Sequence, residues 1–162
     1  MKIVIDSDDF GRDLKNALVN DLKNSGVEIT DLDFLGKQKV DYPDIAINLA
    51  TQIQNRQFDR GILICGTGLG MAMCANKVPG VFAGTCHDIY SAERLVKSNN
   101  AQIITMGAMV IGPELAKMIV RAFIGSEFQG GRSLPKVQRM RELDGCYAAG
   151  KSAQSFLAPC SI

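Results

Sequence analysis

The chain has 162 residues, of which 46% are hydrophobic and 22% are charged, and its formal net charge is +1. This composition is typical of one folded domain with a sizeable core, and it excludes a disordered chain and a broad basic surface for nucleic acid. No apolar run approaches the roughly 20 residues that a membrane-spanning helix needs. Acidic residues directly follow the first apolar run, which argues against a signal peptide. We therefore expect a cytoplasmic protein with neither a nucleic-acid nor a membrane partner.

Short apolar runs alternate with amphipathic stretches along the chain. In chain order they predict a strand at 2–5, a helix at 13–26, a strand at 27–34, a helix at 42–55, a strand at 60–66, a helix at 69–77, a strand at 80–86, a helix at 88–99, a strand at 101–107 and a helix at 113–125. Parallel strands need crossovers long enough for a helix, so this alternation predicts an α/β fold with a five-stranded parallel sheet and helices on both faces.

The pattern changes after about residue 126. The basic stretch that follows indicates a final helix with Val137, Met140 and Leu143 on one side. The last residues, 145–162, are rich in small side chains and have no clear period. We expect one domain over 1–144, followed by a loosely held tail over 145–162.

The sequence contains five cysteines and a single histidine, His87. An odd number of cysteines without close spacing argues against a disulfide framework, and the lack of a C-x-x-C motif argues against a structural metal. Met73 and Cys74 lie in a predicted helix, at positions that predict packing in the core. Cys146 and Cys160 have no assigned role.

Ligands of parallel α/β sheets bind beyond the carboxyl ends of the strands. This rule selects Asp8 and Asp9 after the first predicted strand, the segment 65–70 after the third, and His87 with Asp88 after the fourth. For Asp9 two interpretations are open, a cap of the following helix or a contact with substrate. For His87 we favour a structural, hydrogen-bonded role.

The stretch GILICGTGLGMAMCANKVPG, from residue 61 to 80, places Gly66, Gly68 and Gly70 where a buried strand becomes a helix. Glycines allow close backbone approach, and successive N–H groups there form an anion-binding nest. A tight turn without a ligand is the structural alternative. A dinucleotide loop is a weaker one, because Met71 stands where its third glycine belongs and the turn follows the third strand, not the first. No Gly-Lys-Ser/Thr is present, which excludes a Walker loop.

Cys65 ends the strand that precedes this turn. The field at a helix N-terminus favours thiolate over thiol. A thiolate beside a nest of N–H groups suits proton abstraction next to a carbonyl, because the nest stabilises the enediolate oxygen. Nucleophilic catalysis would also need a histidine, and only His87 is available. The residues therefore favour Cys65 as a general base.

The same stretch closely resembles the core motif of the ribose-5-phosphate isomerase B family, which includes the galactose-6-phosphate isomerase subunits. The resemblance spans about residues 1–143 and continues in DYPDIA (41–46), CHDIYSAE (86–93), NNAQIITMGAMVIGPELAKMIVRAF (99–123) and GGR (130–132). It implies a three-layer, Rossmann-like α/β/α sandwich and an aldose–ketose isomerase for a sugar phosphate. It also implies no metal or other cofactor, and a homodimer or dimer of dimers with active sites at the dimer interface.

The resemblance assigns roles to single residues. Cys65 matches the base that moves a proton between C1 and C2, and Thr67 with the backbone of 66–70 matches the anion hole. The remaining matches are Asp8 for ring opening, Tyr42 and Asn99 for sugar hydroxyls, and Arg132 for the phosphate.

Four positions depart from the family pattern. Asp9 and Ser98 stand where the family has histidines, and Met109 and Lys136 stand where it has arginines. These changes remove positive charge from a site for a dianion, and a phosphate about 4 Å from Asp9 would cost roughly 1–4 kcal/mol. We therefore expect a substrate other than ribose 5-phosphate with little ring form, such as a tetrulose phosphate. The alternative is a non-catalytic sugar-phosphate-binding protein, or a subunit that completes a partner's site.

Overall fold

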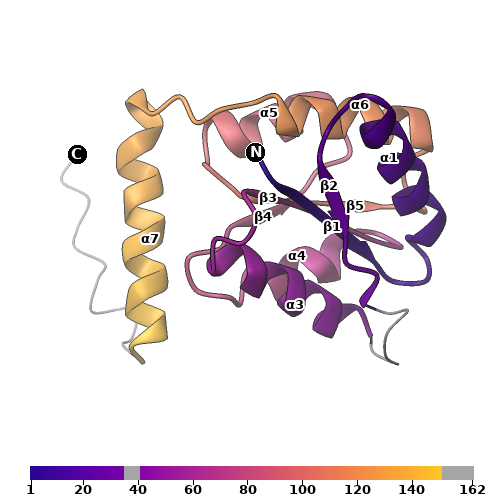
Figure 1. Ribbon diagram of the computed structural model, residues 1–162. Coiled ribbons are helices and arrows are strands. Elements are labelled where there is room, and N and C mark those ends of the chain that lie inside the picture. Colours follow the sequence, from indigo (N-terminus) through magenta and orange to yellow (C-terminus); the bar gives the residue numbers. More distant parts are fainter. Residues whose placement is uncertain (35–40, 151–162) are drawn as a thin grey trace.

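The computed structural model of the protein describes residues 1–34 and 41–150 (Figure 1). Its elements are β1 (Ile3–Ser7), α1 (Arg12–Asn24), β2 (Ile29–Asp31), α3 (Tyr42–Gln54), β3 (Arg60–Cys65), α4 (Leu69–Ala75), β4 (Ala83–Thr85), α5 (Ile89–Lys97), β5 (Ile103–Gly107), α6 (Pro113–Ile124), the 3-10 turn η1 (Gly131–Ser133) and α7 (Leu134–Ala148). Within these residues no helix is long and apolar enough to cross a bilayer.

The strands form one parallel sheet in the order β2-β1-β3-β5-β4. Helices α1, α5 and α6 cover one face, and α3 with α4 covers the other (Figure 1). The predicted parallel sheet and three-layer α/β/α sandwich are confirmed. Because every strand is parallel, all carboxyl ends meet at one edge of the sheet, which we call the carboxyl edge.

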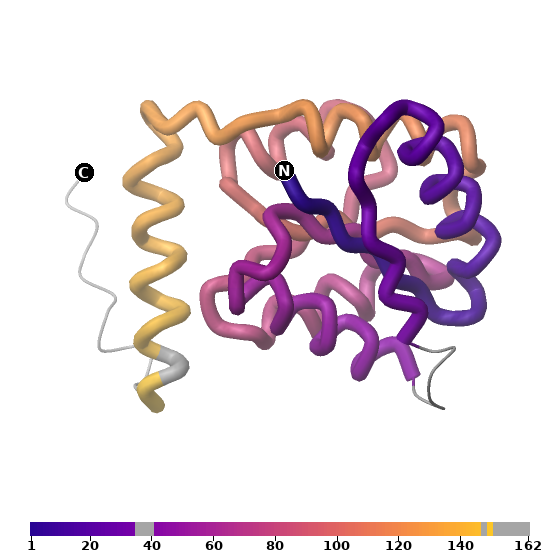
Figure 2. Tube along the Cα trace, in the orientation of Figure 1, coloured from indigo at the N-terminus to yellow at the C-terminus, as the bar shows by residue number. Residues whose placement is uncertain are grey.

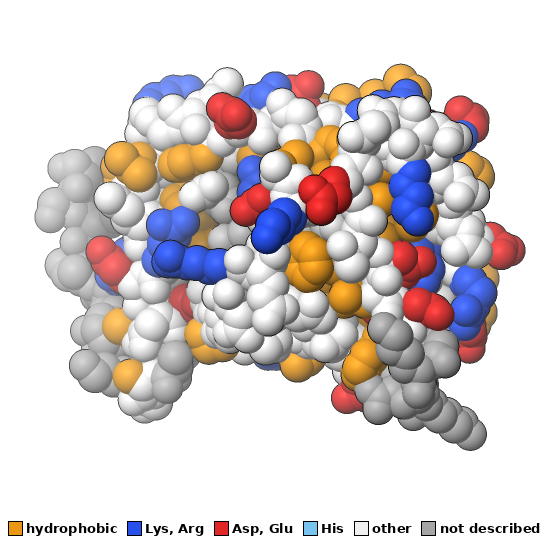
Figure 3. Space-filling model, in the orientation of Figure 1, with side chains coloured by type: hydrophobic (Ala, Val, Ile, Leu, Met, Phe, Trp, Pro, Cys, Tyr) orange, Lys and Arg blue, Asp and Glu red, His pale blue; other side chains and the backbone are white. Residues whose placement is uncertain are grey.

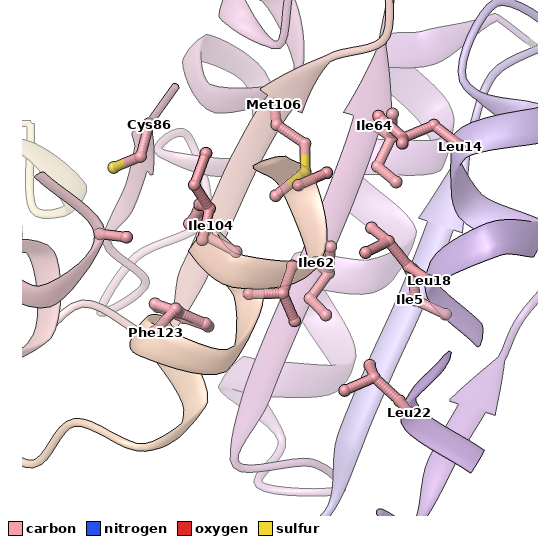
Figure 4. Packing of buried hydrophobic residues seen from close by; sticks show 14 of the residues in the cluster. Ile5, Leu14, Leu18, Leu22, Ile62, Ile64, Cys86, Ile104, Met106 and Phe123 are labelled. Carbon is pink, nitrogen blue, oxygen red and sulfur yellow. The ribbon is translucent and has the colours of Figure 1, made fainter. Parts of the chain in front are cut away.

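Side-chain alternation in β3 divides the core in two. Ile62 and Ile64 face α1 and α6, whereas Leu63 and Cys65 face α3 and α4. Figure 4 shows the first of these clusters, in which Leu14, Leu18 and Leu22 of α1 pack against the strands. Each such buried side chain contributes about 1.5–3 kcal/mol of transfer free energy. The second cluster brings Cys65 to the carboxyl edge on the side of α4.

The two edge strands are shorter than predicted. The strand predicted over 27–34 is β2 in the structure and has only three residues. The strand predicted over 80–86 is β4 and also has three. Each has only one hydrogen-bonded neighbour. The chain leaves β2 soon after Asp31, because Asp33 adopts a left-handed φ of 44°. The predicted ends were wrong because an apolar pattern does not show where pairing stops.

Helix α7 stands apart from the sandwich, as the chain traces of Figures 1 and 2 show. Val137 is its buried contact, and the Gly80 N–H group donates a hydrogen bond to the Asp144 carboxylate. The helix continues to Ala148, so the boundary predicted after residue 144 lies inside it. Residues 151–162 of the predicted tail, with Cys160, lie outside the described residues.

Candidate active site

A cavity of about 270 Å³ opens at the carboxyl edge, between the turns that follow β1, β3 and β5. Its lining residues are Asp8, Phe10, Tyr42, Cys65, Gly66, Thr67, Gly70 and Met109. The structure thus brings together six of the eleven predicted site residues. A larger cleft of about 580 Å³ lies beneath α7 and is lined by none of them. Because the predicted site residues line the smaller cavity, we take it as the candidate active site.

Cys65 is the central residue of this cavity. Its side chain is only 6% exposed, yet the sulfur borders the open space and accepts a hydrogen bond from the Gly68 N–H group, with N and Sγ 3.0 Å apart. Gly68 has a φ of +81°, and a Cβ there would lie 2.9 Å from the Met106 backbone. Only glycine fits this conformation without strain. An N–H donor directed at the sulfur stabilises negative charge on it.

The turn after β5 holds the turn after β3 in place. The Ala108 N–H group donates to the Cys65 carbonyl over 2.8 Å, and the Met109 N–H group donates to the Gly66 carbonyl over 3.0 Å. The Gly107 N–H group instead donates to Nε2 of His87 over 2.9 Å. The hydrogen bond predicted for His87 is therefore confirmed, and its purely structural role stays a prediction.

Asp8 adds a carboxyl group to the cavity. It is half-buried, and its Oδ1 accepts a hydrogen bond from the Gly11 N–H group over 3.0 Å. Burial raises the pKa of Asp8, and the N–H groups of Gly11 and Phe10 offset part of that rise. A carboxyl group with a raised pKa is suited to donating a proton to a bound ligand.

Comparison with known proteins shows where this arrangement is found elsewhere. The model of the Ribose/Galactose Isomerase family matches residues 3–140. The chain belongs to this family. It is 51% identical over 144 residues to the ribose-5-P isomerase B of Listeria innocua, with 89% of this chain and 97% of that protein covered.

One further relative and one solved structure are also similar to this chain. The D-erythrulose-4-phosphate isomerase of Pectobacterium atrosepticum is 49% identical over 142 residues, which cover 86% of this chain and 93% of that protein. The solved structure of Clostridium thermocellum ribose-5-phosphate isomerase B has a TM-score of 0.86 at 41% identity, with 91% and 99% of the two chains covered. The predicted family and its enzyme class, the sugar-phosphate isomerases, are confirmed.

Asn99 does not reach the cavity of its own chain in this isomerase. Helix α5 starts at the carboxyl edge and runs back to the opposite edge, where β5 begins. Asn99 follows the end of α5, is exposed and donates a hydrogen bond to the Arg94 carbonyl. Strand β5 has five residues and spans about 13 Å, which separates Asn99 from Cys65.

Arg132 and Lys136 lie on the same side of the isomerase as Asn99, opposite to the carboxyl edge. The Gln129 N–H group donates to the Lys97 carbonyl, which holds the segment before η1 against the end of α5. Both cations are exposed and have no ion-pair partner in the described part of the chain. Figure 3 shows Lys and Arg side chains left of centre, at the top and at the right of this face.

Of the two interpretations of Asp9, the structure contradicts the helix cap, and contact with substrate stays a prediction. The N-cap of α1 is Gly11, without a side-chain cap, so the capping interpretation is wrong. Asp9 does not line the cavity either. Its carboxylate pairs with Arg12 over 2.9 Å and is 78% exposed. Arg12 offsets the negative charge that would otherwise repel a phosphate.

Exposed apolar side chains lie in the cavity lining and on elements at the carboxyl edge, and most of them were not predicted from the sequence. Met73 is 66% exposed, so its predicted place in the core is wrong, whereas Cys74 is half-buried against the core as expected. Residues from the turns after β1 and β5 and from helices α3, α4 and α5 make up this set, which we call the apolar ring: Phe10, Tyr42, Leu69, Met73, Tyr90, Met109 and Val110. Several large apolar side chains exposed at one edge of a protein are typical of an interaction site. Phe10, a large apolar residue between Asp9 and Gly11, is the signal that could have indicated it.

Proposed function

We propose that this protein interconverts an aldose phosphate and the matching ketose phosphate through a cis-enediol(ate), with Cys65 as the base. One observation carries the proposal: the Cys65 sulfur, which accepts the Gly68 N–H group, borders the same cavity as Asp8. A base, an oxyanion-stabilising turn and a proton donor are the groups that such an isomerisation needs.

The reaction moves one hydrogen between neighbouring carbons and needs no external oxidant or reductant. The Cys65 thiolate removes the proton from the hydroxyl-bearing carbon, and the electron pair of that C–H bond forms the C=C bond of the enediolate. The N–H groups of 66–70, except that of Gly68, which donates to the Cys65 sulfur, hold the negative oxygen together with the Thr67 hydroxyl. Asp8, with its raised pKa, moves the hydroxyl proton between the two oxygens. The Cys65 thiol then returns its proton to the other carbon, which restores the thiolate.

The substrate that fits best is a four-carbon sugar 4-phosphate. The cavity is small, and its lining holds one carboxyl group and no Lys or Arg. A tetrose whose O4 carries the phosphate has no hydroxyl left to close a furanose ring, so it needs no ring-opening histidine at the position of Ser98. The similarity to a D-erythrulose-4-phosphate isomerase supports the same assignment.

The protein acts as a homodimer in this proposal, and Asn99, Arg132 and Lys136 of the second copy complete the site. The cavity lacks a cation for the phosphate, whereas these side chains are exposed at the other edge of the same chain. The apolar ring at the carboxyl edge is the surface that a second copy would cover. A further pairing of dimers and a cytoplasmic location stay predictions.

Exchange of hydrogen with solvent tests the catalytic role. In D2O, the wild type should incorporate deuterium next to the carbonyl of D-erythrulose 4-phosphate, and kcat/KM should exceed that for ribose 5-phosphate at least about tenfold. Cys65→Ala should abolish exchange, whereas Cys74→Ala, a half-buried cysteine outside the cavity, should retain it. Binding without exchange in the wild type would identify a binding protein instead, and a preference for ribose 5-phosphate would overturn the four-carbon assignment.

A further inference from the structure

Two threonine hydroxyls lie directly behind the turn that carries Cys65. Thr105, in the middle of β5, is fully buried, and its Oγ1 donates a hydrogen bond to the Gly68 carbonyl over 2.8 Å. The hydroxyl of Thr85, on the neighbouring strand β4, lies 2.8 Å from Oγ1 of Thr105 and 3.3 Å from the same carbonyl. With the Thr105 proton on the carbonyl, the single Thr85 proton is shared between Thr105 Oγ1, at the shorter distance, and the same carbonyl, so the three groups form one cluster.

The Gly68 carbonyl therefore accepts a second hydrogen bond in addition to the one from its helical partner. It accepts the Ala72 N–H group over 3.1 Å, as the first carbonyl of α4 should, and the Thr105 hydroxyl in addition. On its other side, the same residue directs its N–H group at the Cys65 sulfur. The two peptide groups meet at the Gly68 Cα, so a contact that fixes the carbonyl restricts the ways in which the neighbouring N–H group can turn.

Gly68 needs such an anchor. Its φ of +81° is in the left-handed region, where glycine also has many competing conformations. Without a fixed carbonyl, the N–H group would be free to turn away from the sulfur. An anchor on β5 is firm, because β5 is hydrogen-bonded to strands on both sides.

The position of Thr105 is otherwise unfavourable for a polar side chain. Its neighbours Ile103, Ile104 and Met106 are all fully buried. A buried hydroxyl costs free energy unless it is hydrogen-bonded, and an apolar β-branched residue would suit the strand as well. The hydroxyl is directed at the backbone of the Cys65 turn and not at its own strand, which indicates a task at that turn.

We propose that Thr105 is a positioning residue for Cys65: through the Gly68 carbonyl it holds the Gly68 N–H group against the sulfur, and Thr85 strengthens that contact as the outer donor of the cluster. The inference rests on the proposed function, in which the Cys65 thiolate is the base. It assigns to Thr105 no contact with substrate.

The test compares Thr105→Val, which keeps the shape of the side chain, with Thr105→Ser, which keeps the hydroxyl. Two quantities are measured: steady-state isomerisation of D-erythrulose 4-phosphate, and the rate at which iodoacetamide alkylates Cys65 as a function of pH, followed by mass spectrometry of the Cys65 peptide. Thr105→Val should lower kcat about fivefold with little change in KM, because about one neutral hydrogen bond is lost at a point that the substrate does not touch. Its alkylation curve should move to higher pH, because less thiolate is present at a given pH.

Rescue distinguishes positioning from general stability. Thr105→Ser should restore both the kcat and the alkylation curve, and Thr85→Val, which removes only the outer donor, should move both in the same direction by a smaller amount. If Thr105→Val does not fold, Thr85→Val against wild type provides the same comparison. An alkylation curve that stays unchanged in the folded variants, or a Thr105→Ser protein as impaired as Thr105→Val, would overturn the inference.

The two proposals fail in different ways. Alkylation of Cys65 requires no turnover, so a shifted alkylation curve in a protein that isomerises no sugar phosphate overturns the proposed function and leaves the positioning role standing. An unshifted curve in a protein whose isomerase activity disappears in Cys65→Ala overturns only the positioning role.

Discussion

At the scale of single residues, the turn after β3 depends on a conformation and a space that only glycine tolerates. Gly68 and Gly80 have nearly the same φ, +81° and +80°. A Cβ at Gly68 would lie 2.9 Å from the Met106 backbone, whereas a Cβ at Gly80 would meet nothing within 4 Å. The two glycines therefore separate the cost of left-handed backbone from the cost of a clash.

We expect Gly68→Ala to lower the free energy of unfolding by about 2–4 kcal/mol, and Gly80→Ala by only about 1 kcal/mol. The cost at Gly68 includes backbone strain and a clash with β5, whereas the cost at Gly80 comes from backbone strain alone. Urea unfolding of both variants measures the difference. Gly68→Ala should also lose most of the isomerase activity, because the N–H group at the Cys65 sulfur moves. Equal destabilisation by the two substitutions would contradict the clash.

Local pairing explains why the sequence did not reveal the partner of Asp9. A carboxylate just before a helix fits a cap, but it also fits an i, i+3 pair with a basic residue, and Arg12 stands at that spacing. The helix cap and the ion pair with Arg12 fit the same local sequence pattern. Only the path of the chain through Gly11 determines which of the two forms. The positions of Cys65, Thr67 and Asp8 at the cavity were predictable, because strand ends and the turn motif can be recognised from consecutive residues.

At the scale of elements, the buried strands were predictable and the edges were not. The unbroken apolar run of β3 predicts burial on both faces, and the strand is buried over nearly its whole length. Helix α5 begins after Asp88, whose carboxylate accepts the Ser91 N–H group over 2.7 Å. By contrast, the exposure of Met73 depends on what covers α4, and its own helical period does not contain that information.

Strand β1 carries a buried carboxyl group, Asp6, whose titration should be visible in stability. Its carboxylate accepts hydrogen bonds from the Ser7 N–H group over 2.8 Å and from the Phe34 N–H group over 3.2 Å. Burial nevertheless raises the pKa of Asp6, although these two N–H groups and nearby Lys15 offset part of the rise. A carboxyl group whose pKa is higher in the folded than in the unfolded protein destabilises the fold at neutral pH.

The sign of the pH dependence follows from that shift. As the pH falls from 7 toward the unfolded-state pKa of about 4, the folded protein takes up the Asp6 proton first, and the penalty disappears. Asp6→Asn has no such penalty at any pH and keeps an oxygen for one N–H group. We therefore expect the free energy of unfolding of wild type, minus that of Asp6→Asn, to become more favourable to wild type on acidification. Denaturant unfolding at several pH values measures this difference, and a constant difference would exclude a raised pKa.

At the scale of the whole molecule, the predicted site residues fall into two groups at opposite edges of the chain, and the proposed dimer would bring these groups together. The Cys65 cavity opens at the carboxyl edge, where exposed apolar side chains also lie, whereas Asn99 and Arg132 lie at the opposite edge. In a two-fold symmetric dimer, each edge of one copy meets the opposite edge of the other, so two complete sites form. Resemblance to the family indicated the residues of both groups, but the distance between the two groups is evident only in the folded chain.

Mixed dimers test this arrangement. Cys65→Ala and Arg132→Ala should each be nearly inactive alone. After the two proteins are mixed and refolded together, half of the dimers contain one chain of each kind, and in those dimers one site has both defects and the other has none, so about a quarter of the wild-type activity should return. Restored activity in the mixture, with none in the separate proteins, is the expected result. No restoration, although the chains exchange, would mean that Arg132 serves the cavity of its own chain or none.

A matched pair of methionines shows whether the apolar ring forms the contact. Met73 of α4 belongs to the ring, and Met118 of α6 lies outside it, although the two are similarly exposed at 66% and 53%. A buried, unpaired carboxylate in an interface is strongly unfavourable, so Met73→Glu in both chains should abolish the restored activity and give monomers in sedimentation velocity. Met118→Glu should leave both unchanged. If Met118→Glu dissociates the protein and Met73→Glu does not, the two copies meet through α6, and the cavity must obtain its phosphate-binding cations in another way.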